Sequence, residues 1–250
     1  MLELPFWLPI AFFLIALVYS MVGFAGGSSY LAILILAGLP YKQVPPIALT
    51  CNLIVSCSAF WHFYKGGYFN FKSVLPFIVL SIPMAFLGGK MAIDKELFYL
   101  LLGFSLLVAG VRLLMPDKKF EDHCFVSLKE RWFVGAPLGA GLGFLSGLVG
   151  IGGGIFLSPL LLLMRWVNAK EAAAAASFFI LVNSLSGLLG QAQKATIIAP
   201  QSFIFLGFAV LLGGQIGARI GSYRLPRLGL QRITALLILY VSINLITKAF

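Results

Sequence analysis

The sequence predicts an all-α polytopic membrane protein built as two inverted repeats of about five segments each, with a glycine-broken, half-length helix in each repeat. Three observations predict this class. The 250 residues are 60% hydrophobic and only 10% charged, whereas a soluble domain carries about 25% charged residues. The apolar residues form continuous blocks, unlike the alternating pattern of a transmembrane β-barrel. Three internal sequence matches at a nearly constant offset divide the chain into similar halves.

The two halves share three short stretches in the same order. SMVGFAGGSSYLAILIL from Ser20 aligns with SGLVGIGGGIFLSPLLL from Ser146, an offset of 126. TCNLIVSCSAF from Thr50 aligns with SFFILVNSLSG from Ser177 at an offset of 127, and FLGGKMA aligns with LLGGQIGA at an offset of 125. This duplication predicts repeat 1 over 1–114, a polar cytoplasmic linker over 115–131 and repeat 2 over 132–250.

The first apolar block of each half is too long for one helix. Residues 6–39 would form a helix about 51 Å long, well beyond a hydrocarbon core of about 30 Å. Glycines at 23, 26 and 27 interrupt this block, and glycines within 150–154 interrupt the equivalent block 132–165. Two segments joined at the glycines are therefore expected in each half, the second too short for a full span.

The charges in the loops favour ten segments over eight. With both first blocks broken, 13 of the 18 lysines and arginines fall on one side of the membrane, whereas unbroken blocks give nine on each side. The positive-inside rule then places both termini outside and gives the two halves opposite orientations, as in many secondary transporters. The other segments are expected at 45–63, 73–92, 97–115, 171–191, 200–220 and 231–247.

Several function classes are disfavoured by what the sequence lacks. Most basic residues lie in short loops between apolar blocks, so the net charge of +10 reflects membrane orientation and no nucleic-acid partner is expected. The chain has no Ser-His-Asp set and no His/Cys/carboxylate cluster with metal-ligand spacing, so no enzyme, cofactor or metal site is expected. The stretch GLVGIGGGIFLSP also lacks the Gly-Lys-Ser/Thr ending of a phosphate loop.

The two glycine-rich breaks are the predicted binding site. Non-helical backbone at membrane depth persists only where protein shields it or where it lines a polar cavity. The N-terminus of a half-helix favours an anion because its N–H groups carry partial positive charge. The alternative is a kink that only permits close packing. The predicted residues are Gly26, Gly27 and Ser28 in the first break and Gly152, Gly153 and Gly154 in the second.

The helix that follows each broken pair holds most of the intramembrane polar residues. Asparagine is the most informative because its amide is hard to bury, whereas serine and threonine often bond to their own helix. The alternative to lining a site is that these side chains form hydrogen bonds between helices. No Asp or Glu lies in the middle of an apolar block, and His62 is expected as an interfacial anchor. The candidate lining residues are Thr50, Asn52, Ser56, Ser177, Asn183 and Ser184.

Two stripes of glycine four residues apart predict close helix packing. Small residues let helices approach in lipid, where burial of apolar area gives little drive for association. The stripes are Gly135, Gly139, Gly143 and Gly147, and Gly213, Gly217 and Gly221.

The paired glycine-rich motif, the polar helix after it and the later LGG element resemble the sulfite exporter TauE/SafE family of membrane permeases. The second copy is the closer match, since Ser28 replaces the third glycine of the first copy and Ile33 stands where the second has Pro159. The resemblance covers nearly the whole chain. It implies a multi-pass protein of the bacterial inner membrane that moves small sulfur-containing anions, such as sulfite and organosulfonates.

We therefore expect a secondary transporter in which the two repeats alternate access to a central anion site. The first alternative is an anion channel with the same breaks lining a pore. The second is a membrane component without transport activity. The lipid bilayer and a small sulfur-containing anion are the expected partners, and the oligomeric state stays open.

Overall fold

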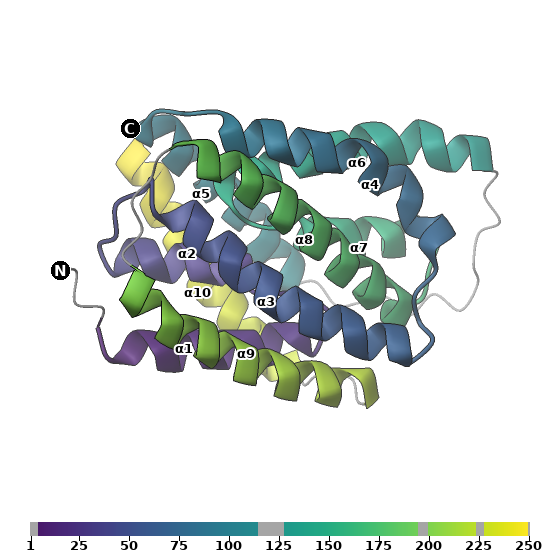
Figure 1. Ribbon diagram of the computed structural model, residues 1–250, viewed down its shortest axis with the longest axis horizontal. Coiled ribbons are helices and arrows are strands. Elements are labelled where there is room, and N and C mark those ends of the chain that lie inside the picture. Colours follow the sequence, from purple (N-terminus) through teal and green to yellow (C-terminus); the bar gives the residue numbers. More distant parts are fainter. Residues whose placement is uncertain (1–4, 115–127, 195–199, 224–227, 250) are drawn as a thin grey trace.

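In a computed structural model, the described residues are 5–114, 128–194, 200–223 and 228–249. Within these ranges the chain forms ten α-helices and one short 3-10 helix, with no strand (Figure 1). The predicted all-α class is confirmed. The first half contains α1 (Trp7–Ser20), α2 (Gly27–Leu36), α3 (Val44–Lys65), α4 (Phe71–Lys90) and α5 (Lys95–Leu114). The second contains α6 (Leu128–Val149), α7 (Gly154–Leu163), α8 (Ala169–Gln191), α9 (Pro200–Tyr223) and α10 (Leu228–Ala249).

The six segments predicted after the broken blocks correspond to α3, α4, α5, α8, α9 and α10, with ends that differ by at most three residues. Residues 115–127 of the predicted linker lie outside the described residues. Its last four residues, 128–131, begin α6.

Five described helices, α3, α4, α6, α8 and α9, are long and apolar enough to cross a membrane. The half-helices α2 and α7 have 10 residues each, or about 15 Å of helix, half of a hydrocarbon core. They therefore reach only the middle of a bilayer. The chain is a multi-pass membrane protein with two short helices that start near its centre.

Both predicted helix breaks are present. The first separates α1 from α2 over residues 21–26, and the second separates α6 from α7 over 150–153. In Figure 1, α2 runs back toward the end of the molecule that holds the N-terminus, and the C-terminus lies at that same end. The loops after α2 and α4 lie at this end, and those after α3 and α7 lie at the other (Figure 1).

The main contacts between helices come in pairs that are related by exchange of the two halves of the chain. α4 packs along α6 and α8, while α9 packs along α1 and α3. α3 also packs on α8, and α5 packs on α10. In Figure 1, α3 and α8 run in opposite directions along the molecule, as do α4 and α9. The main contacts of the first-half helices thus have counterparts among the second-half helices.

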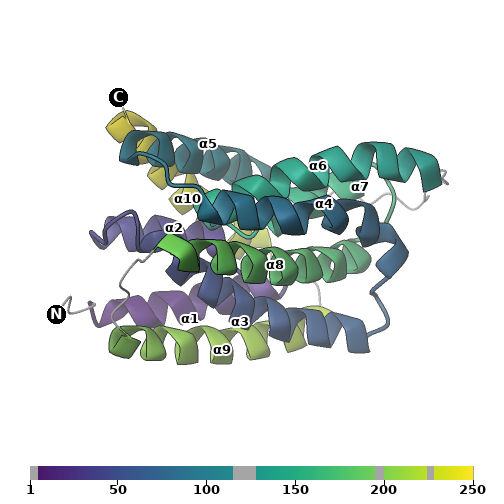
Figure 2. The ribbon, with the colours of Figure 1, turned by 45° about the horizontal axis from the view of Figure 1, so that its top comes forward.

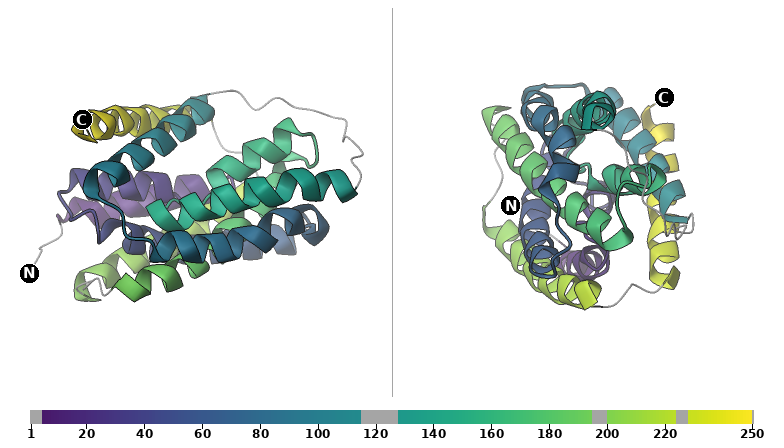
Figure 3. Two further views of the ribbon diagram at one scale, coloured as in Figure 1. Left: turned by 90° about the horizontal axis from the view of Figure 1, so that it is seen from above. Right: turned by 90° about the vertical axis from the view of Figure 1, so that its right-hand side faces the viewer.

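The centre of the bundle is formed by α3 and α8. About two-thirds of the most apolar part of each is buried (67%), against 39–44% for α4, α6 and α9. α5 and α10 form a separate layer at one side of the bundle (Figures 2 and 3). This layer contacts the half-helices, α10 against α2 and α5 against α7. The half-helices are therefore enclosed between the central helices and this outer pair.

Two helices that start at the end of the bundle opposite the N-terminus, α4 and α8, have side-chain caps. Asn168 accepts the N–H of Glu171, whose carboxylate accepts the N–H of Asn168, which is a capping box. Asn70 caps α4 by accepting the N–H of Lys72 at 3.1 Å. The half-helices α2 and α7 have no side-chain cap. The same is true of α1 and α3, so the absence of a cap does not by itself distinguish the helices that start at the centre.

Both glycine stripes lie at helix contacts, as predicted. On α6, a Cβ at Gly139 would overlap the carbonyl of Phe77, and one at Gly143 would overlap that of Ser81. On α9, Gly217 lies in the same way against the carbonyl of Leu17 of α1. The backbones of these helix pairs are in direct contact, so even a methyl group has no room there.

The stripe on α6 makes a paired prediction. Gly143→Ala should lower the free energy of unfolding by about 1–3 kcal/mol, because the added methyl group meets backbone that cannot move without separating α4 from α6. Gly141, two residues away, has nothing within 4 Å of its Cβ position. Gly141→Ala should be neutral or stabilising by up to about 1 kcal/mol, since alanine favours helix over glycine. Unfolding titrations of both variants in detergent micelles measure the difference, and equal stabilities would contradict the assigned contact.

Candidate functional site

The two helix breaks meet at the centre of the molecule. Gly27 is the first residue of α2, and a Cβ there would overlap the carbonyl oxygen of Ile151 in the second break. The same Cβ would overlap the side-chain amide of Asn52 on α3. The start of one half-helix therefore lies directly against the backbone of the opposite break.

Positive backbone φ angles explain why both breaks contain glycine. In the first break, φ is +77° at Gly23 and +91° at Gly26. In the second, φ is +93° at Gly150, +88° at Gly152 and +76° at Gly153. Residues with a Cβ rarely adopt this left-handed conformation, whereas glycine adopts it readily.

The structure corrects the alignment of the breaks by one residue. Gly26 and Gly153 are the left-handed N-caps of α2 and α7, so the equivalent positions differ by 127 and not 126. Ser28 then corresponds to Ile155 and not to Gly154. The backbone φ angles and the first residues of α2 and α7 show which positions are equivalent. The two glycine-rich sequences alone can be aligned in several registers.

Each break is also packed against the first turns of the third helix of the other half. Gly23 lies against the backbone of Ala173 near the start of α8. A Cβ at Gly150 would lie 2.8 Å from the Cα of Pro45 at the start of α3. The non-helical backbone is thus shielded by protein, which is the condition for its presence at membrane depth.

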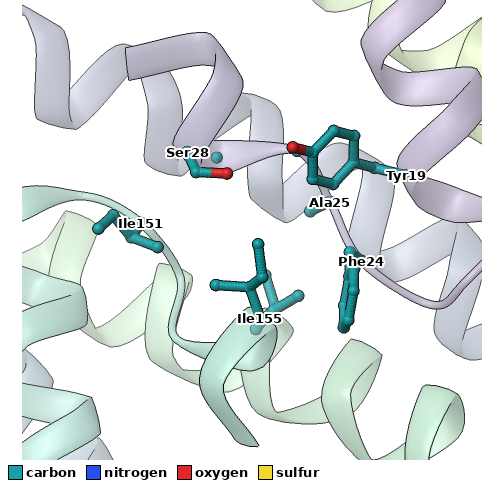
Figure 4. Close-up of a pocket in the computed structure, with 9 residues that line it drawn as sticks. Tyr19, Phe24, Ala25, Ser28, Ile151 and Ile155 are labelled. Atoms are coloured by element: carbon teal, nitrogen blue, oxygen red, sulfur yellow. The ribbon is translucent and has the colours of Figure 1, made fainter. Parts of the chain in front are cut away.

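A small cavity lies at the junction of the breaks (Figure 4). Its volume is about 10 Å³, which is roughly the space for one water molecule. Tyr19, Ser28 and the backbone at the start of α2 supply its polar atoms. Ile151 and Ile155 lie across from them in Figure 4. In this conformation the cavity is too small for even a small oxyanion, which is larger than one water molecule.

The start of α2 and the first turn of α7 both border this cavity, α2 through Gly27 and Ser28 and α7 through Ile155. The first N–H groups of a helix have no acceptor within the helix. Together with the helix dipole, they place a partial positive charge at each helix start. This arrangement favours an anion over a cation.

Asn52 joins the two halves at this point. Its Nδ2 donates to the carbonyl oxygens of Gly150 at 3.3 Å and Ile151 at 3.2 Å. The side chain is fully buried, and its Oδ1 has no hydrogen-bond partner. The orientation of the amide follows from these contacts, since a flipped amide would direct Oδ1 at two carbonyl oxygens.

Ser184 lies on the other side of the second break. A Cβ at Gly152 would lie 3.0 Å from Nδ2 of Asn52 and 3.5 Å from Oγ of Ser184. The hydroxyl of Ser184 is buried and without a partner. The structure therefore brings together Gly27, Asn52, Gly152 and Ser184 from four separate segments, next to Gly26 and Ser28 at the cavity.

The remaining predicted site residues do not line the cavity. Ser56 and Ser177 are buried, but their hydroxyls donate to Leu53 and Ala174 of their own helices. Asn183 donates to Phe179 at 2.8 Å, and its Oδ1 has no partner. Gly153 and Gly154 pack against Phe179 and Ile180. Thr50 is exposed and donates to Pro46 of its own helix, so the structure does not bring it to the cavity.

Sequence reasoning missed two tyrosines beside the first break. The hydroxyl of Tyr19 lies 2.8 Å from Oγ of Ser29, and both residues are buried. Tyr30 is fully buried and stacks on Phe12, yet its hydroxyl has no partner. Both tyrosines lie within predicted segments, but α1 and α2 meet only because the break reverses the chain. No spacing rule within one helix would have paired them.

The other polar features lie away from the breaks. His62 contacts Gln215 of α9 at 3.0 Å near the end of α3. Cys51 is buried and Cys57 is exposed, so they lie on different faces of α3. A larger, open depression of about 530 Å³ lies beside Lys72 and Glu171 at the end of the bundle. Among the described residues, no group of three metal-ligating side chains occurs.

Comparisons with known proteins agree with the resemblance drawn from the motifs. A family model described as "Sulfite exporter TauE/SafE" matches residues 8–245. The chain is 34% identical over 241 residues to "Probable membrane transporter protein y4hK" of Sinorhizobium fredii (strain NBRC 101917 / NGR234), covering 96% of this chain and 97% of that relative. It is 23% identical over 228 residues to "Probable membrane transporter protein YunE" of Bacillus subtilis (strain 168), covering 81% and 82%. No solved structure matches the chain.

The contacts of Asn52 predict a large effect on stability. Asn52→Ala should lower the free energy of unfolding by about 1–3 kcal/mol, because it leaves two buried carbonyl oxygens without their donor. The matched control is Asn244→Ala, since Nδ2 of Asn244 bonds only to Tyr240 of its own helix in an exposed position. That variant should stay within about 0.5 kcal/mol of the parent. Unfolding titrations in mixed micelles measure both, and a neutral Asn52→Ala would refute the bridging role.

Proposed function

The chain belongs to the sulfite exporter TauE/SafE family, and we propose that it is a secondary transporter of small sulfur-containing anions such as sulfite or organosulfonates. The carrier would lie in the bacterial inner membrane and would carry out no catalysis. The observation that carries the proposal is the junction of the two breaks. Two half-helix starts border one small cavity there, and the buried Asn52 contacts Gly27 and Ile151 of its lining.

The helix contacts support a mechanism of alternating access. We propose that 1–114 and 132–250 are inverted repeats, because their helices have interchangeable neighbours and opposite directions. Movement of one repeat against the other would open the cavity to one side at a time. The glycines of the breaks are the natural points of this movement, since they are the positions where the backbone leaves the helix.

The distribution of charge supports an anion as the cargo. None of the described residues that line the cavity carries a charge, so the positive helix starts dominate the local field. The loops that the sequence assigns to one side of the membrane, which hold 13 lysines and arginines, would face the cytoplasm. An inside-negative potential then drives an anion outward by about 2.3 kcal/mol per charge per 100 mV. Export would need no coupled ion.

The small size of the cavity favours a carrier over a channel. A channel needs a continuous pore, whereas the breaks in this conformation leave room for only one water molecule. Single-channel currents in planar bilayers, or turnover far above carrier rates, would establish the channel instead.

Transport should depend on the contact between the breaks. In proteoliposomes, uptake of radiolabelled sulfite should fall at least roughly tenfold in Gly27→Ala, which corresponds to about 1.4 kcal/mol, because the methyl group separates the breaks. Gly207→Ala on α9 is the matched control, since its Cβ would meet only an Ile54 methyl group at 3.7 Å. It should transport like the parent. If folded Gly27→Ala took up sulfite as fast as the parent, the transport site could not be at the junction of the breaks. If the parent showed no flux, it would not transport sulfite.

A further inference from the structure

We infer that the junction of the breaks selects anions that donate a hydrogen bond, through Oδ1 of Asn52. The cargo of this site would be a singly charged, protonated oxyanion such as hydrogensulfite, in preference to the sulfite dianion or a sulfonate without a donor. This inference rests on the proposed function and concerns the same site.

The carbonyl of the Asn52 amide is an acceptor that the protein leaves unused. Nδ2 is held by Gly150 and Ile151, so Oδ1 cannot exchange places with it. Oδ1 is buried and has no partner among the described residues. A buried acceptor without a donor is unfavourable, and such groups are uncommon in folded proteins. A ligand with a donor would remove this deficit when it binds.

Oδ1 lies directly behind two residues of the cavity lining, Gly27 and Ile151. A Cβ at Gly27 would be 2.9 Å from Oδ1, so this acceptor lies beside the first residue of α2. Gly27 and Ile151 both border the cavity and both contact Asn52. Separation of the breaks, which a ligand larger than water requires, therefore uncovers the amide. Ser184 adds a second unpartnered oxygen across Gly152.

A site with donors and one fixed acceptor distinguishes oxyanions by protonation. The N–H groups at the start of α2 donate to the oxygens of any oxyanion. Oδ1 repels a bare anionic oxygen but accepts from the O–H of hydrogensulfite in its hydroxyl form. Methanesulfonate has the same single charge and a similar shape but no donor, so it leaves Oδ1 unpaired.

The surroundings of Asn52 disfavour a double charge. The titratable side chains nearby are Tyr19, Tyr30 and Cys51 of α1, α2 and α3, whose phenol and thiol groups are neutral near pH 7. The second break and α8 present backbone, Ile180 and Ser184 at this place. With no basic side chain lining the cavity, a dianion would lose its hydration without a compensating positive charge.

The test compares the two anions in proteoliposomes containing the full chain. At about pH 6, where both carry one charge, labelled hydrogensulfite should enter at least roughly tenfold faster than labelled methanesulfonate after subtraction of protein-free vesicles. Raising both compartments to about pH 8 should lower sulfite uptake in proportion to the remaining hydrogensulfite. Equal uptake of both anions, or sulfite uptake that rises with pH, would overturn the inference and leave the proposed function intact.

The role of Asn52 itself is tested by Asn52→Leu, with Asn244→Leu as control. The ratio of hydrogensulfite to methanesulfonate uptake should fall to about one in Asn52→Leu and stay unchanged in Asn244→Leu. An unchanged ratio in folded Asn52→Leu would assign the selectivity to another group and overturn the inference. If that variant does not fold, the comparison of anions in the parent decides alone. Uptake of neither anion by the parent would instead reject the proposed function.

Discussion

The structure depends on one constraint, which is that backbone N–H and C=O groups in the middle of a bilayer must be paired or shielded by protein. Both first helices of the two halves stop there, so the constraint applies twice. The chain meets it by placing the breaks against each other and against the third helix of the opposite half, with Gly23 on Ala173 and Gly150 near Pro45. Asn52 completes this arrangement by donating to two carbonyl oxygens of the second break.

The rest of the architecture follows from keeping this junction buried and closely packed. The central helices α3 and α8 supply the walls of the junction, and the layer of α5 and α10 encloses the half-helices from outside. Glycine serves two separate purposes. At the breaks it permits positive φ, whereas on α6 and α9 it brings backbones into direct contact. The junction itself is held by close backbone contact and the two hydrogen bonds of Asn52, so the proposed opening of the cavity would have to break only these.

Much of the fold could be predicted because membrane segments are encoded in composition and length. Apolar blocks, loop charges and glycine positions placed the helices to within a few residues and located both breaks. The candidate site was harder, since a polar residue on a helix acquires its role from its neighbours. Ser56, Ser177 and Thr50 bond to their own helices, and nothing in their spacing distinguishes them from Asn52. The carbonyl partners of Asn52 lie 98 and 99 residues away in the chain, beyond any local pattern.

The central claim is that one anion binds both breaks at once, and hydrogen–deuterium exchange measures this directly. In lipid nanodiscs at about pH 6, saturating sulfite should slow exchange of the backbone amides in 21–29 and in 149–156 together, because both stretches surround the same cavity. Amides of α9, such as those in 204–213, should exchange as they do without sulfite. Slower exchange at one break alone, or at neither while sulfite is transported, would contradict the account.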